Sequence, residues 1–181
     1  LSRRQRQMCI RDRSNTEATV ESTVDRVNSD LLDIRQIFDA ANYNIVQEFD
    51  ISSEKFAEQF SLLYEVNSDK IESLALYGNE GRLIASEPVA VEKENIDVKG
   101  QDWYKNAESA IENVHFSIPH IQNLYEDGLY RYHWVVSLSR YVDINDGEIP
   151  GSGVLLVDMK YSVIEDVLKP VSYTHLTLPT T

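Results

Sequence analysis

The sequence predicts an α+β fold, and three observations carry that prediction. An unbroken apolar stripe at helical spacing runs through residues 15–49, and a second, shorter helical pattern follows it. Residues 70–86 then show two short strand patterns around a glycine-containing loop, which is typical of a β-hairpin. Alternating residues over 130–144 and a continuous apolar run over 154–159 complete a mostly antiparallel sheet of about five strands.

The N-terminal helix is the strongest single prediction. Its apolar residues step alternately by four and by three, and no Gly or Pro interrupts them. This spacing favours a helix packed along its own domain, with a dimer seam at its N-terminal end as the alternative. The stripe consists of Val20, Val24, Val27, Leu31, Ile34, Phe38, Ala41 and Ile45.

A second helix and a hairpin are expected next. Ser52 or Ser53 can cap the helix, which should end near Val66. After a turn, residues 70–77 and 82–86 are expected to pair as antiparallel strands.

The segment after residue 100 carries the most distinctive residues. A short helix is expected over 102–113, with Asp102 as its N-cap and Trp103 in its first turn. Apolar residues alternate over 114–125, where Pro119 indicates an edge strand or a bulge.

The last two strands are expected at 130–144 and 154–159, with the glycine-rich residues 145–153 as a long loop between them. A further helix should begin near Tyr161. Alternation along the first strand separates two faces, and the sequence alone does not say which of them is inner. One face holds Tyr132, Trp134 and Val136, and the other holds Arg131, His133 and Val135.

The two ends differ from the middle of the chain. Residues 1–13 hold five Arg against one Asp, and residues 170–181 hold no charged side chain. Both resemble translated sequencing-adapter sequence, so we expect neither to belong to the domain. The alternative for residues 1–13 is a basic tail that binds nucleic acid or a membrane.

Charge and cysteine content restrict the partners of residues 14–169. Without the two ends, 12 basic residues face 29 acidic ones, a formal charge of -17. Nucleic acid and anionic lipid both need cationic contacts, so neither is an expected partner. Cys9 is the only cysteine and lies in the excluded end, so we expect no disulfide, thiolate metal site or cysteine nucleophile. No apolar run approaches the roughly 20 residues that span a bilayer.

Four motifs occur in a telling order. They are Asp102-Trp103-Tyr104, then residues 116–124 (FSIPHIQNL), residues 134–140 (WVVSLSR) and residues 153–159 (GVLLVDM). Together they resemble the membrane-distal half of a double Cache sensor domain, as found in sensor histidine kinases of clostridial-type Gram-positive bacteria. The resemblance covers about residues 15–169.

This resemblance implies a signalling helix over 14–49 and a PAS-like Cache module over 50–169, the membrane-distal half of a longer sensor. The implied protein is a two-component sensor histidine kinase of the cell membrane, with this domain on the extracellular side and transmembrane segments outside this sequence. The domain would bind a small polar solute and form a homodimer through its N-terminal helix. The alternatives are the sensor of a chemoreceptor or cyclic-dinucleotide enzyme, and a structural or dimerisation module without a ligand.

The aromatic pair Trp103 and Tyr104 is predicted to lie over the ligand, with core packing against the sheet as the alternative. Similar Cache domains that bind amino acids carry an Arg-x-Trp-Tyr pattern here, in which the arginine holds the ligand carboxylate by a bidentate pair. This chain has Gln101 at that position. Because glutamine supplies no charge, the resemblance implies a sensor and disfavours a free amino acid as its ligand.

Four more residues complete the predicted ligand site. Asp158 lies in an apolar strand, where an unpaired carboxylate is costly to bury. The resemblance implies that it receives a ligand ammonium, while capping of the next helix is the alternative. His120 is expected as a polar residue of the pocket, or else as an ordinary core or surface histidine. Tyr132 and Trp134 are expected on the pocket floor, on strands that also carry Tyr125 and Ser137.

Catalysis is not expected of this segment, and neither is a metal or a cofactor. The chain has no glycine-rich phosphate loop, no His-Glu-x-x-His helix and no Gly-x-Ser-x-Gly elbow.

Overall fold

The computed structural model describes residues 18, 21–22, 24–25, 28–29, 32–109, 113–126, 132–147 and 149–165. The chain divides into two compact units, one of residues 34–161 and one of residues 1–33 with 162–181. Described residues of the second unit are helical. Both predicted adapter-like ends lie outside the described residues, as do Val20, Val27 and Leu31 of the predicted stripe. No helix among the described residues is long and apolar enough to cross a membrane.

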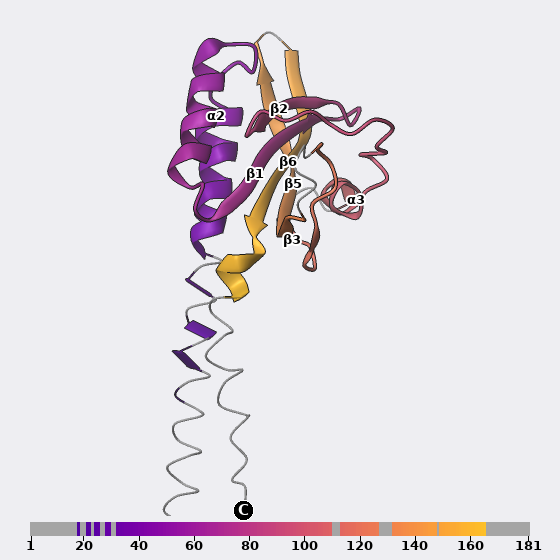
Figure 1. The fold of residues 1–181 in the computed structure, drawn as a ribbon. Coiled ribbons are helices and arrows are strands. Elements are labelled where there is room, and N and C mark those ends of the chain that lie inside the picture. The colour runs from indigo at the N-terminus through magenta and orange to yellow at the C-terminus, as the bar shows by residue number, and fades with distance from the viewer. Residues whose placement is uncertain are drawn as a thin grey trace, which may run out of the picture. The chain divides into compact units, whose positions relative to one another are not determined.

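A six-stranded antiparallel sheet forms the centre of the 34–161 unit, which confirms the predicted α+β class. Its order is β2-β1-β6-β5-β3, and β4 also pairs with β5. The strands are β1 (Ile71–Gly78), β2 (Leu83–Glu87), β3 (His115–Phe116), β4 (His120–Ile121), β5 (Trp134–Asp146) and β6 (Ile149–Lys160). Figure 1 shows helix α2 on one side of this sheet and α3 on the other.

The N-terminal helix changes its winding before it ends. Residues 32–39 are α-helical, and η1 (Ala40–Val46) is a π-helix that contacts α2 and β5. The predicted stripe residues of this part are buried, and so are three neighbours of the stripe. Asn42 and Val46 lie in the π-helix, whose different hydrogen-bond spacing shifts the apolar face, whereas Ile37 lies in the preceding α-helical part at ordinary helical spacing from Ile34. The stripe residues are Ile34, Phe38, Ala41 and Ile45, and the added ones are Ile37, Asn42 and Val46.

Helix α2 (Glu54–Val66) begins and ends as predicted. The Ser53 hydroxyl accepts the backbone N–H of Phe56 at 3.1 Å, so Ser53 rather than Ser52 is the cap. Helix α3 (Asp102–Ser109) differs at its start. The carbonyl of Gln101 accepts the N–H of Lys105 at 3.1 Å, which makes Gln101 the cap and places Asp102 in the first turn. Residues 110–112 of the predicted helix lie outside the described residues, and Asn113, its predicted last residue, is not helical.

The predicted long loop over 145–153 is wrong. Strands β5 and β6 remain paired as far as Asp146 and Ile149, and Gly147 takes a positive φ of 64° in the turn. Gly153 lies inside β6. Only glycine fits at this position, because a Cβ would collide with the backbone carbonyl of Tyr77 on β1. The glycines of this segment therefore allow a tight turn and a close strand contact.

The predicted single strand over 114–125 is also wrong. Its three alternating apolar residues are exposed, with Phe116 at 47%, Ile118 at 82% and Ile121 at 37%. Instead the two short strands β3 and β4 flank Pro119 and pair separately with β5.

The two faces of the sheet bury different residues. On one side of the sheet, helix α2 contacts β1 and η1 contacts β5. Alternation along the strands places an apolar layer on this side, which consists of Leu74, Leu76, Leu138, Leu155 and Val157. Helix α3 contacts β5 and β6 and closes the other side. There the apolar core consists of Ala75, Tyr77, Val98, Trp103, Tyr104, Ala107, Leu124, Val154 and Leu156.

Candidate ligand site

A buried carboxylate marks the face under α3. Asp158 follows Val154 and Leu156 in the alternation of β6 and is only 1% exposed. Ser137 of β5 and Ser73 of β1 lie opposite it in the register. Ser137 Oγ donates to Asp158 Oδ1 at 2.5 Å, and Ser73 Oγ donates to Asp158 Oδ2 at 2.9 Å. This interior position does not fit the helix cap considered above for Asp158.

Asp158 is a buried carboxyl group whose two oxygens accept hydrogen bonds from neutral serine hydroxyls. Burial raises the pKa of its carboxyl, while the hydrogen bonds from Ser137 and Ser73 and the charge of His120 oppose that rise. Removing a carboxylate from water is costly unless a cation compensates it. A cationic group brought to this site would therefore gain a strong electrostatic partner.

His120 approaches the carboxylate through Ser137. Its Nε2 lies 3.4 Å from Ser137 Oγ, and its Nδ1 lies 3.0 Å from the carbonyl oxygen of Ile118 and 3.2 Å from Ser117 Oγ. Ser117 Oγ also accepts the backbone N–H of Ser137 at 2.8 Å. Strand β4 is thus joined to the central strands beside Asp158 by side-chain hydrogen bonds.

Aromatic side chains adjoin the polar cluster. The hydroxyls of Tyr77 and Tyr125 lie 3.0 Å apart, and the ring of Trp103 lies 5.3 Å from that of Tyr77 between centroids. Burial raises the pKa of both tyrosines, and the charges of Asp158 and Glu92 raise it further, so both hydroxyls stay neutral at physiological pH. The Oε1 atom of Glu92 is buried without a hydrogen-bond partner.

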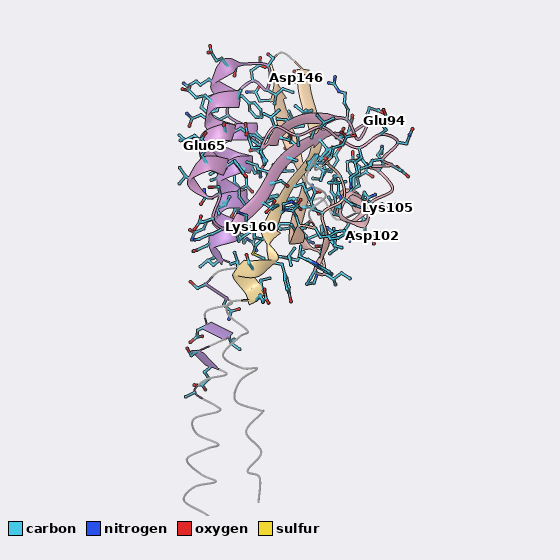
Figure 2. The ribbon with its side chains drawn as sticks, viewed as in Figure 1. Glu65, Glu94, Asp102, Lys105, Asp146 and Lys160 are labelled. Carbon is cyan, nitrogen blue, oxygen red and sulfur yellow. The ribbon has the colours of Figure 1, made fainter. Side chains whose placement is uncertain are left out.

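Helix α3 is fastened to the sheet by two hydrogen bonds at its aromatic pair. Ser139 Oγ donates to the carbonyl of Trp103 at 2.9 Å, and the Tyr104 hydroxyl donates to the carbonyl of Gly78 at 2.9 Å. Burial raises the pKa of Tyr104 to about 12. Asp102 and Lys105 of this helix are exposed (Figure 2). Trp103 therefore adjoins the polar cluster, while Tyr104 anchors the helix.

Gln101 lies at the N-terminal end of α3. Its side-chain amide donates to the carbonyl of Asp97 at 3.3 Å. This contact ties the glutamine to the preceding loop.

Tyr132 and Trp134 lie elsewhere. They are 78% and 51% exposed, and the Trp134 ring lies 6.3 Å from that of Tyr161. Alternation along β5 gives Trp134 the face opposite to that of Ser137. The structure thus brings Trp103, His120 and Asp158 to one face of the sheet and does not bring Tyr132 and Trp134 there.

Three residues of the site were not selected from the sequence. Ser73 and Tyr77 alternate with Leu74 and Leu76 along β1, and this alternation is the sequence pattern that could have indicated them. Glu92 comes from an irregular segment and reaches Tyr125 through an isolated bridge, which no local pattern announces. Among the described residues, no group of three or more His, Cys, Asp and Glu side chains could hold a metal ion.

Comparisons with known proteins address the fold. No protein-family model matches the sequence, and no curated protein matches it. The ligand-binding domain of the amino acid chemoreceptor PctC of Pseudomonas aeruginosa, in complex with GABA, aligns with 87% of this chain at 18% identity and a TM-score of 0.68. That of the Pseudomonas fluorescens chemoreceptor CtaA with L-serine aligns with 87% at 19% identity and a TM-score of 0.62.

The ligand-binding domain of Mlp24 with asparagine aligns with 86% of the chain at 9% identity and a TM-score of 0.58. The chain spans 67%, 62% and 60% of the lengths of these three neighbours, in the same order. At such identities the likeness concerns the fold. The fold of this chain is therefore similar to that of ligand-binding domains of chemoreceptors, which agrees with the Cache-type fold that the sequence resemblance implies.

Proposed function

We propose that this chain is the extracytoplasmic ligand-sensing domain of a transmembrane receptor and that it binds a small polar solute through an ammonium group beside Asp158. The observation that carries the proposal is the buried carboxylate, held by two serine hydroxyls next to an aromatic wall. An ammonium there would supply the compensating charge, and aromatic faces attract cations. GABA, L-serine and asparagine, which the neighbours bind, each carry an amino group.

The other end of the ligand is expected to lack a carboxylate that needs a charged clamp. Gln101 is neutral, and the two lysines near α3 have other partners. Lys99 Nζ donates to the carbonyl of Asn79 at 3.0 Å, and Lys105 Nζ donates to that of Gly100 at 2.6 Å. The site therefore suits a simple amine better than an α-amino acid.

We further propose that ligand binding shifts a conformational equilibrium of the domain. The N-terminal helix over 14–49 would carry that shift to the partner in a homodimer. A two-component histidine kinase is the output that the sequence resemblance implies. A chemoreceptor output fits equally well, because the structural neighbours are chemoreceptor domains.

The test compares amines with amino acids of the same skeleton. Ethanolamine differs from L-serine, and propylamine from GABA, only by the loss of the carboxylate. Calorimetry and thermal shift should show that the amines bind more tightly, since a ligand of the native state raises the melting temperature.

The matched variants are Asp158→Asn and Asp146→Asn. Removing the buried charge should weaken amine binding by roughly 100-fold, the scale of a broken buried charge pair. Asp146 is exposed at the far end of β5 (Figure 2), so its substitution should leave affinity unchanged. Equal binding by wild type and Asp158→Asn, or no binding by any of the four compounds, would contradict the proposal and favour a structural module.

A further inference from the structure

The hydrogen bonds around His120 fix which ring nitrogen carries a proton. Ser117 Oγ donates to the carbonyl of Ile118 at 2.9 Å and accepts the N–H of Ser137. Its own proton is therefore engaged, and the Ile118 carbonyl can only accept. Both neighbours of His120 Nδ1 are thus acceptors, so Nδ1 is the protonated nitrogen of the neutral ring. Nε2 is left as the nitrogen that gains or loses a proton.

Ser137 joins this nitrogen to the carboxylate. Its hydroxyl has one proton, which it donates to Asp158 Oδ1, while His120 Nε2 lies on its other side. With Nε2 unprotonated, two acceptors face a single hydroxyl proton. With Nε2 protonated, the ring donates to Ser137 and Ser137 donates to Asp158, so every group has a partner. The second state also places a positive charge two hydrogen bonds away from the carboxylate.

We propose that His120 sets the charge that Asp158 offers to the ligand, and thereby makes the affinity for a cationic ligand depend on pH. The inference rests on the proposed function of this site. The imidazolium and the ligand ammonium would compete for the same carboxylate, since two like charges near one anion repel each other. Binding of an amine should therefore favour the neutral ring and should release a proton at mildly acidic pH.

Other ionisable groups around Asp158 do not reproduce this behaviour. Tyr77 and Tyr125 stay neutral in the pH range of an imidazole because burial raises the pKa of both. Glu92 has a buried carboxylate oxygen, and its charge acts on the two tyrosines. Glu72 is the remaining charge that acts on Asp158, and its Oε1 lies 2.7 Å from Nδ1 of His133. His133 is thus the second histidine to control for.

The first test needs no ligand. Nitrogen NMR of the histidine rings should show the Nδ1–H tautomer for neutral His120 at high pH. An Nε2–H tautomer would overturn the inference whether or not a ligand is known.

The second test follows ethanolamine binding by calorimetry between pH 5.5 and 8, where its amine stays protonated. In the wild type, the affinity for ethanolamine should rise roughly tenfold with pH, because the repulsion between a charged imidazole and the ligand ammonium is lost. The rise should disappear in His120→Gln, which keeps a neutral polar side chain, and persist in His133→Asn. Proton release should appear as a dependence of the binding heat on the buffer.

The outcomes separate the two proposals. Ethanolamine that binds with a flat pH profile in the wild type would refute the role of His120 and leave the proposed function standing. Loss of the profile in His133→Asn but not in His120→Gln would assign the effect to the pair of His133 with Glu72, and would also refute it. Failure of every amine to bind would remove the proposed function, and with it the ligand half of this inference. The wild-type measurements decide the flat pH profile and the failure of every amine to bind, even if a variant fails to fold.

Discussion

The two faces of the central sheet use neighbouring residues of the same three strands for opposite purposes. Leu74, Val157 and Leu138 lie level with one another on the side of α2 and η1. One residue away, Ser73, Asp158 and Ser137 form a hydrogen-bonded row on the side of α3. A strand presents successive side chains to opposite faces, so a single step along the chain separates an apolar layer from a polar one.

The difference teaches where stability and binding reside. Burying one leucine side chain contributes about 1.5–3 kcal/mol, whereas a buried carboxylate without a cation opposes folding. The apolar layer towards α2 is therefore expected to stabilise the fold. On the face towards α3, the row of Ser73, Asp158 and Ser137 gives up stability to keep a charged group available, which is common at functional sites.

Substitution in the apolar layer should have the largest effect on stability. Leu155 is fully buried in β6, so Leu155→Ala should lower the free energy of unfolding by about 2–5 kcal/mol through lost contacts and a residual cavity. Leu62 on α2 is 49% exposed, and Leu62→Ala should change stability by about 0.5 kcal/mol or less. Urea denaturation measures both. Similar losses at the two positions would mean that this apolar layer does not stabilise the fold.

Above mildly acidic pH, Asp158→Asn is expected to raise the free energy of unfolding, by less than Leu155→Ala lowers it. Burial raises the pKa of the folded carboxyl above its unfolded value of 3.8. The stability tied to its protonated form is fully present below the unfolded pKa and is lost as pH rises through the folded pKa. The amide cannot ionise, so the variant should gain stability relative to the wild type as pH increases.

Asp50 gives the matched control for that pH series. It is only partly buried, and hydrogen bonds from the Ser52 side chain and backbone lower its pKa, so its contribution is present above the unfolded pKa and is lost as pH falls. Asp50→Asn should therefore lose stability relative to the wild type as pH rises, the reverse of Asp158→Asn. Denaturation at several pH values checks both signs. The same sign for both variants would refute the assignment of Asp158 as a buried, destabilising charge.

The smallest effect on stability should come from substitution of Tyr104, which anchors α3 to the sheet. Tyr104→Phe removes one hydrogen bond to Gly78 and should cost about 1 kcal/mol, while amine affinity stays close to that of the wild type. Tyr43→Phe, which removes an exposed bond from Arg140, should cost less. A large loss of affinity in Tyr104→Phe would restore Tyr104 to the ligand site and weaken the division between anchor and wall.

Much of the architecture could be predicted because it depends on local patterns. The two-residue period of β1, the cap at Ser53 and the helical spacing up to Val66 each follow from neighbours in the chain. The errors arose where a residue serves a distant partner. Gly153 looked like part of a loop because the approaching backbone of Tyr77 is 76 residues away in the sequence.

The sequence by itself determined the fold class, the acidic character and the candidate residues Trp103, His120 and Asp158. Composition and periodicity depend only on the order of residues, and the motifs carry the family likeness. Only the tertiary structure decided which face of β5 adjoins Asp158, and so set Ser137 beside it and Trp134 apart from it. That choice depends on which helices cover each side of the sheet, and alternation alone is symmetric between the two.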